Sequence, residues 1–91
     1  AEEALSIGLV NKVVEPEELE EAAMAMAENI ARKSPYIVRV AKRAVRAALD
    51  LPFAEGVLVE RSEFVALFDT EDKEIGVSAF LERKDAEWVG R

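Results

Sequence analysis

The stretch that decides the fold is residues 70–88, T-E-D-K-E-I-G-V-S-A-F-L-E-R-K-D-A-E-W. The hydroxyl of Thr70 can cap a helix, and the acidic residues after it suit the positive end of a helix dipole. A helix is therefore predicted to begin at Glu71 and to end near Arg83 and Lys84, since cations are favoured in a last turn. Its spacing indicates a broad buried face, made of Ile75, Val77, Ala79, Phe80 and Leu81.

Three more helices are predicted before this one. Residues 16–33 open with proline and a run of glutamates, both typical of a helix start. Ser34-Pro35 ends that helix and caps the next, residues 35–49. A further helix covers residues 52–68, and Gly56 within it indicates the close approach of another backbone. The side chains expected inside are Ile37, Ala41, Ala44, Val45, Ala48, Ala54, Val57, Leu58, Phe64, Val65 and Phe68.

The first fifteen residues differ from the rest. Residues 1–6 resemble the end of a short helix that Gly8 terminates. The β-branched run of residues 9–14 predicts a short strand or extended segment, and a strand here has no obvious partner within the chain. Because the chain also opens in the middle of a helical pattern, we expect it to be a C-terminal piece of a longer protein.

Composition excludes several function classes. The formal net charge is −7, which argues against nucleic acid as a partner. The chain has no cysteine and no histidine, so a thiolate site, a Ser-His arrangement and the usual zinc ligands are all missing. No apolar run reaches the length of a membrane span, and no signal-peptide pattern is present. We expect a cytoplasmic protein without a membrane partner.

Charged residues form two patterns that invite a functional interpretation. Arg39, Lys42, Arg43 and Arg46 share one helix face, which is either a phosphate-binding stripe or a solvated face that pairs with the preceding glutamate-rich helix. Glutamates spaced by three, at 60 and 63 and again at 71 and 74, lie on faces that the pattern predicts to be solvated. Acid/base catalysis needs enclosed carboxylates, so no catalytic residue is predicted.

Aromatic residues suggest a cluster. Phe64 and Phe68 are one helical turn apart, and Phe80 follows from the next helix, so these rings are expected to pack together. The pattern alone favours a role in the core.

Several segments, in order, resemble one enzyme family. These are A-E-E-A-L-S-I-G-L-V-N-K-V-V at residues 1–14, Ser34-Pro35 with A-K-R-A-V, Glu55-Gly56, and T-x-D-x-x-x-G-x-x-A-F-L-E-R-K from Thr70. Together they are similar to the C-terminal region of the crotonase superfamily, the enoyl-CoA hydratases and isomerases. The sequence departs from the family pattern at Ile75, where an acid is usual, and at Ala86, where proline is common.

The resemblance implies a specific role for this region. The catalytic acids and the oxyanion hole of such enzymes belong to a preceding spiral domain, whose motifs are missing here. The implied fold is a mainly α, small helical oligomerisation domain (residues 16–91) after the end of the spiral domain (residues 1–15). The implied ligand is a coenzyme A thioester, as substrate rather than cofactor. Phe64 and Phe80 match positions that line the acyl-CoA pocket, and Arg83 matches a basic position near a CoA phosphate.

Three functional hypotheses remain open. The first is the C-terminal part of an enoyl-CoA hydratase/isomerase-like enzyme, which supplies contacts with other copies of the same chain, in a trimer or a dimer of trimers, and part of the pocket wall. The second is a free-standing helical module that binds another protein. The third, an autonomous small enzyme, has the least support, because no acid/base pair is enclosed.

Overall fold

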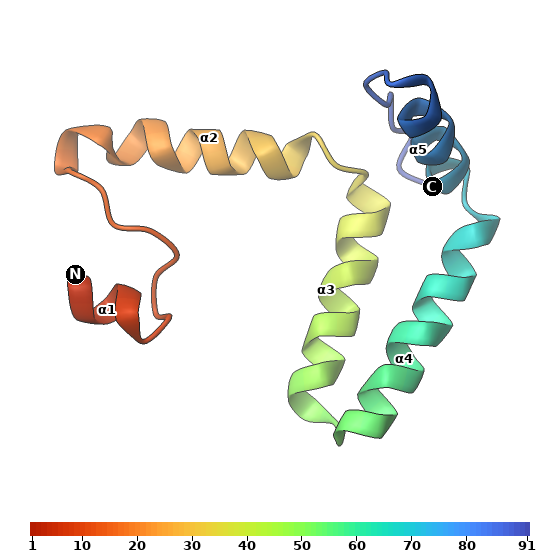
Figure 1. The fold of residues 1–91 in the computed structure, drawn as a ribbon, viewed down its shortest axis with the longest axis horizontal. Helices are drawn as coiled ribbons and strands as arrows, with labels where there is room; N and C mark the ends of the chain where they lie inside the picture. The colour runs from red at the N-terminus through yellow and green to blue at the C-terminus, as the bar shows by residue number, and fades with distance from the viewer. The chain divides into compact units, whose positions relative to one another are not determined.

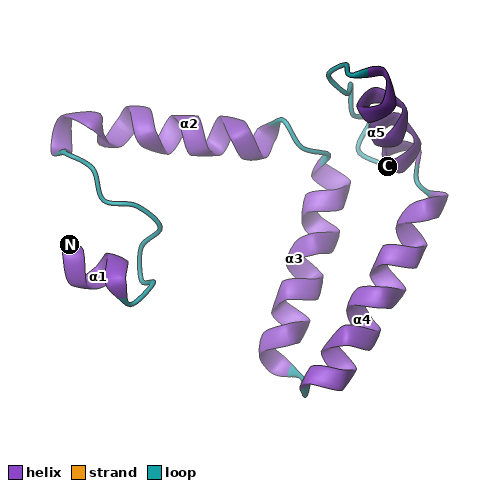
Figure 2. Cartoon of the chain, viewed as in Figure 1, coloured by secondary structure: helices purple, strands orange, loops and turns teal.

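The computed structural model describes residues 1–91, and every regular element in it is a helix (Figure 2). The elements are α1 (Glu2–Ser6), the 3₁₀ turn η1 (Pro16–Glu18), α2 (Leu19–Ala31), α3 (Pro35–Asp50), α4 (Phe53–Ala66), the 3₁₀ turn η2 (Leu67–Asp69) and α5 (Glu71–Glu82). The predicted mainly α fold is confirmed, with helix boundaries within about three residues of those expected. None of the helices combines the length and the apolar character that crossing a bilayer requires.

The chain divides into two compact units, Ala1–Arg32 and Lys33–Arg91. In the first unit, α1 ends at Ser6, Ile7 is its C-cap, and Gly8 follows at a φ of +75°, as predicted. The predicted strand at residues 9–14 is wrong. A strand needs a neighbouring strand to satisfy its backbone groups, and here the N–H groups of Leu9 and Val10 instead donate to the carbonyl of Ala4, at 2.8 and 3.3 Å.

The rest of the first unit is the glutamate-rich helix. Pro16 begins it, but the first turn is 3₁₀, and regular α-helix starts at Leu19. The division expected at residues 15/16, between a spiral-domain end and a helical domain, stays a prediction.

In the second unit, α3 and α4 form an antiparallel helical hairpin, and α5 lies at the end where α3 begins and α4 finishes (Figure 1). The hairpin closes tightly at Gly56. A methyl group placed on Gly56 would lie 3.4 Å from the Cα atom of Ala48. The close backbone approach predicted from this glycine is therefore confirmed.

Both predicted helix caps are present. The Ser34 Oγ atom accepts a hydrogen bond from Ile37 N at 3.2 Å, and the Thr70 Oγ1 atom accepts one from Lys73 N at 3.2 Å. The other end of α5 differs from expectation. The helix ends at Glu82, and Arg83 adopts a left-handed conformation with φ 55° and ψ 45°. Arg83 and Lys84 thus follow the helix rather than occupy its last turn.

The expected core is largely wrong. Val40 is the one buried hydrophobic side chain, although the pattern did not single it out. The residues expected inside α3, α4 and α5 but found exposed are Ala41, Val45, Ala48, Ala54, Leu58, Phe64, Val65, Phe68, Val77, Phe80 and Leu81. A two-helix hairpin covers only a narrow strip on each helix, so these wide apolar faces have no covering layer within the chain.

Candidate functional site

Phe64 lies in an apolar groove of the second unit. Its ring meets the ring of Phe68 edge-on, with centroids 5.4 Å apart and an interplanar angle of 81°. Such an arrangement is favoured by the ring quadrupoles. The groove has a volume of about 340 Å³ and is lined by Ile37, Phe64, Leu67, Phe68, Asp72, Lys73, Gly76 and Val77. We refer to these eight residues as the apolar groove.

Lys73 is the one basic residue that lines the apolar groove. The Nζ atom of Lys73 lies 5.0 Å from the centroid of the Phe68 ring, a cation–π geometry. The same atom is 3.4 Å from the Glu74 carboxylate. The groove therefore offers aromatic surface beside an ammonium group, which suits a ligand that combines an apolar part with a negative charge.

Phe80 and Arg83 do not line the apolar groove. Phe80 is 82% exposed, and its backbone carbonyl accepts a hydrogen bond from Arg83 N at 3.2 Å. The structure thus brings Phe80 and Arg83 together at the end of α5 and leaves Phe64 apart from them. The predicted packing of Phe80 with Phe64 and Phe68 is wrong, because α5 turns this ring outward.

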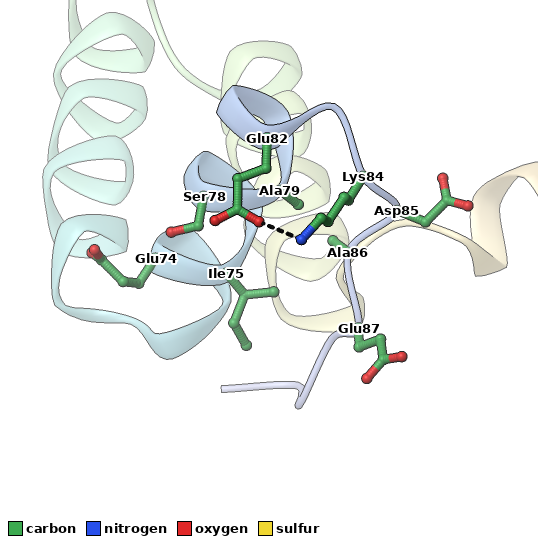
Figure 3. A pocket seen from close by; sticks show the side chains of 9 residues that line it. All are labelled: Glu74, Ile75, Ser78, Ala79, Glu82, Lys84, Asp85, Ala86 and Glu87. Carbon is green, nitrogen blue, oxygen red and sulfur yellow. Dashed lines mark ion pairs between the residues drawn. The ribbon is translucent and has the colours of Figure 1, made fainter.

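An acidic hollow lies between α5 and the residues that follow it (Figure 3). Its volume is about 460 Å³, and its lining consists of Glu74, Ile75, Ser78, Ala79, Glu82, Lys84, Asp85, Ala86 and Glu87. The Lys84 ammonium is held by Glu82 at 3.0 Å. Four carboxylates against this one paired cation repel a phosphate, so the hollow does not suit the charged part of a CoA ester.

On the basic face of α3, one cation, Arg43, is held by an ion pair with a neighbouring helix. Arg43 forms two hydrogen bonds with the Glu63 carboxylate, both at 3.0 Å, and so joins α3 to α4. The hydrogen bond from Arg43 lowers the pKa of Glu63, which is the opposite of what a general acid needs. Arg39, Lys42 and Arg46 are exposed, as predicted.

Asp72 is the residue whose role the sequence pattern missed. Its side chain is fully buried and accepts hydrogen bonds from the Ser34 hydroxyl, from Val89 N at 2.8 Å and from Gly90 N at 3.0 Å. Burial acts to raise its pKa, but these hydrogen bonds and the charge of Arg91 outweigh burial and hold the pKa below its usual value. The pattern placed Asp72 only as a first-turn acid, because partners 17, 18 and 38 residues away leave no local signal.

No arrangement for acid/base or metal chemistry is visible. No group of three acidic, histidine or cysteine side chains is placed to hold a metal ion. Every buried side-chain polar atom has a hydrogen-bond partner, so none is left to meet a ligand.

Known proteins resemble this chain along its whole length. The model of the enoyl-CoA hydratase/isomerase family matches residues 1–91. A probable enoyl-CoA hydratase of Rhizobium meliloti is 44% identical over 91 residues, and an (E)-benzylidenesuccinyl-CoA hydratase of Thauera aromatica is 43% identical over 84. These matches cover 100% and 92% of the chain but 35% and 33% of the relatives.

A solved structure agrees with these relatives. The crystal structure of an enoyl-CoA hydratase from Bacillus anthracis superposes with a TM-score of 0.94 at 34% identity, over 100% of this chain and 35% of that protein. The chain therefore spans about one third of the proteins it matches. By sequence over all 91 residues and by fold, the chain belongs to the enoyl-CoA hydratase/isomerase family.

Proposed function

We propose that this chain forms the C-terminal helical part of an enzyme that hydrates or isomerises an enoyl-CoA thioester. In this role it supplies contacts between subunits and part of the acyl-CoA pocket wall, and the chemistry belongs to residues outside these 91. The support comes from the family match over the whole chain together with its share of about one third of each relative.

Exposed apolar side chains support the proposed contacts between subunits. Phe53 and Leu49 are 87% and 82% exposed at the turn of the α3–α4 hairpin, and Phe80 is 82% exposed near the end of α5. Covering one such side chain is favourable by about 1.5–3 kcal/mol. Faces of this kind support an assembly in which other protein surfaces or a ligand cover them.

Phe64, Phe80 and Arg83 are the proposed ligand residues of this wall. Phe64 offers aromatic surface inside the apolar groove, and Phe80 offers it on the outer face of α5. Arg83, directly after α5, presents a guanidinium that is suited to phosphate oxygens. Because the two sites are separate within the chain, we assign them to different parts of an extended thioester ligand.

A chimaeric enzyme tests the proposal. The matching third of the Bacillus anthracis hydratase is replaced by this chain, and hydration of crotonyl-CoA is followed. We expect activity to persist, and we expect Phe80→Ala and Arg83→Ala each to raise KM, the latter more at low salt than at high salt because exposed charges are screened.

Matched controls accompany these variants. Leu81→Ala removes another exposed apolar side chain of α5, and Arg46→Ala removes an exposed cation of the α3 stripe, so both should leave KM unchanged. If KM rises in Arg46→Ala and stays unchanged in Arg83→Ala, the phosphate contact belongs to the cations of α3 and not to Arg83. Turnover of crotonyl-CoA by the 91-residue chain alone would contradict the proposal.

A further inference from the structure

The residues after α5 fold back along that helix. The chain reverses at Arg83, where the backbone is left-handed, and the returning segment reaches Asp72 in the first turn of α5. Twelve helical residues are about 18 Å long, whereas eight residues can span at most about 26–29 Å when fully extended. Residues 84–91, here called the C-terminal strap, are therefore long enough to span α5 from one end to the other.

The strap is held at both ends and in the middle. At its far end the Asp72 carboxylate accepts from the N–H groups of Val89 and Gly90, while Asp72 N donates to the carbonyl of Arg91 at 2.8 Å. At its near end Lys84 N donates to the carbonyl of Ala79 at 2.9 Å.

Between these ends Trp88 lies on Gly76. A methyl group placed on Gly76 would be 3.0 and 3.1 Å from two carbon atoms of the indole ring, closer than ordinary contact. The absence of a side chain at position 76 thus lets the indole ring approach the backbone of α5 closely. Position 88 also carries the single tryptophan of the chain, which makes it a reporter of the strap.

We propose that Asp72 is a positioning residue that latches the C-terminal strap and thereby keeps Arg83 in its left-handed turn at the opposite end of α5. A non-glycine residue in this region is sterically unfavourable, so other contacts must stabilise the turn. Two backbone hydrogen bonds close the turn locally, from Arg83 N to the Phe80 carbonyl and from Lys84 N to the Ala79 carbonyl, whereas the apolar core gives no support, since Val40 is the one buried hydrophobic side chain and lies on α3. The buried carboxylate adds the side-chain contact that ties Val89 and Gly90 of the returning strap to the start of α5.

The negative charge of the carboxylate explains why an aspartate is suited to hold the strap. The Oδ2 atom accepts from both Ser34 and Gly90, and Oδ1 accepts from Val89. An ionised carboxylate can accept all three bonds, whereas an amide at the same place turns one acceptor into a donor. The charge that acts on Asp72 is that of Arg91 on the strap, which is itself paired with Glu71 at 2.9 Å. The other charged residue next to Asp72 in the sequence of α5 is Lys73, and Ser34, the N-cap of α3, contributes its hydroxyl.

The latch depends on pH in a defined direction. Because the pKa of Asp72 is lowered in the folded chain, its stabilising effect is present above the ordinary aspartate pKa of 3.8 and is lost as the pH falls through the lower folded value. Other carboxylates titrate in the same range, so a variant at pH 7 is the sharper test.

The experiment uses Trp88 fluorescence and amide exchange in the full 91-residue chain at pH 7. In Asp72→Asn we expect a red-shifted emission, a several-fold increase in iodide quenching, and faster exchange of the Lys84, Val89 and Gly90 amides, while circular dichroism shows that the α3–α4 hairpin stays helical. Ser34→Ala removes one donor to Asp72 and also the N-cap of α3, and it should shift the same signals less while circular dichroism shows that α3 stays helical. Asp69→Asn, an exposed aspartate with the same change in charge, should shift none.

Each outcome decides the proposal. Unchanged quenching and exchange in Asp72→Asn overturn it. If that variant loses its helices altogether, Ser34→Ala decides: raised quenching with intact helices supports the latch, and unchanged quenching overturns it. The relevance of Arg83 to a ligand rests on the proposed function, but this experiment uses no ligand. If Asp72 holds the strap and the chimaeric enzyme does not bind CoA, only the proposed function is refuted. If the chimaeric enzyme binds CoA and Asp72 does not hold the strap, only the positioning role is refuted.

Discussion

Arg83 shows how much a single residue can depend on its surroundings. It is the one non-glycine residue of the chain with a positive φ, at the position after a helix where glycine is usual. Strained backbone is found preferentially at functional sites. The proposed phosphate contact thus coincides with the one backbone position whose conformation opposes its residue type.

This coincidence yields a prediction that separates stability from binding. Arg83→Gly should stabilise the chain by about 1 kcal/mol, because glycine enters the left-handed region without the steric cost. The same variant should raise the KM of the chimaeric enzyme as much as Arg83→Ala does, since both remove the guanidinium. Thermal melting of the 91-residue chain and crotonyl-CoA kinetics supply the two readouts. A lower melting temperature for Arg83→Gly would show that the side chain itself stabilises the turn.

At the scale of elements, the α3–α4 hairpin depends on small residues more than on a wide apolar seam. Ala48 and Gly56 allow the two backbones to approach, and the Arg43–Glu63 pair joins the helices from outside. The pair is partly exposed and therefore screened by solvent. The close approach at Gly56 is thus the more specific feature of this contact.

Two substitutions at Gly56 should act in opposite directions. Alanine raises helix propensity by up to about 1 kcal/mol, and its methyl group fits at ordinary contact distance from Ala48, so Gly56→Ala should leave stability unchanged or slightly higher. Leucine places further carbon atoms where the Ala48 backbone lies, so Gly56→Leu should lower the melting temperature clearly. Equal melting temperatures for both variants would mean that the helices separate freely.

At the scale of the whole molecule, the exposed apolar side chains predict association. Phe53, at the first position of α4, is the most exposed of them. A glutamate there suits the helix N-terminus, so Phe53→Glu should keep the chain folded while it removes apolar surface. Burial of a phenylalanine is favourable by about 1.5–3 kcal/mol, and the loss should weaken self-association by roughly 10- to 100-fold.

Sedimentation equilibrium of the 91-residue chain measures this effect. We expect a concentration-dependent oligomer for the unsubstituted chain and a monomer for Phe53→Glu. Glu60→Gln, a change at an exposed polar position of the same helix, serves as the control. A monomer that melts at low temperature, even without substitution, would mean that the apolar faces require protein outside these 91 residues.

The sequence by itself determined which segments are helices and where most of them begin. Capping by Ser34 and Thr70, the proline starts and the close approach at Gly56 were all predictable, because each depends on residues within a turn or on side-chain size alone. The family resemblance was also predictable, since it rests on ordered local motifs.

Only the tertiary structure decided which apolar helix faces are buried and which charged residues make specific contacts. Helical periodicity identifies an apolar face but cannot say whether another layer exists to bury it, so the exposed positions of Phe64 and Phe80 went unpredicted. The prediction of a short strand was wrong for a related reason, because a strand must pair with another strand that local sequence does not reveal. Asp72 looked like one of many first-turn acids, and Arg83 like a last-turn cation. Their roles come from a strap that returns along α5. The contacts of the Asp72 carboxylate join residues 17 or more positions apart, and local patterns do not record such contacts.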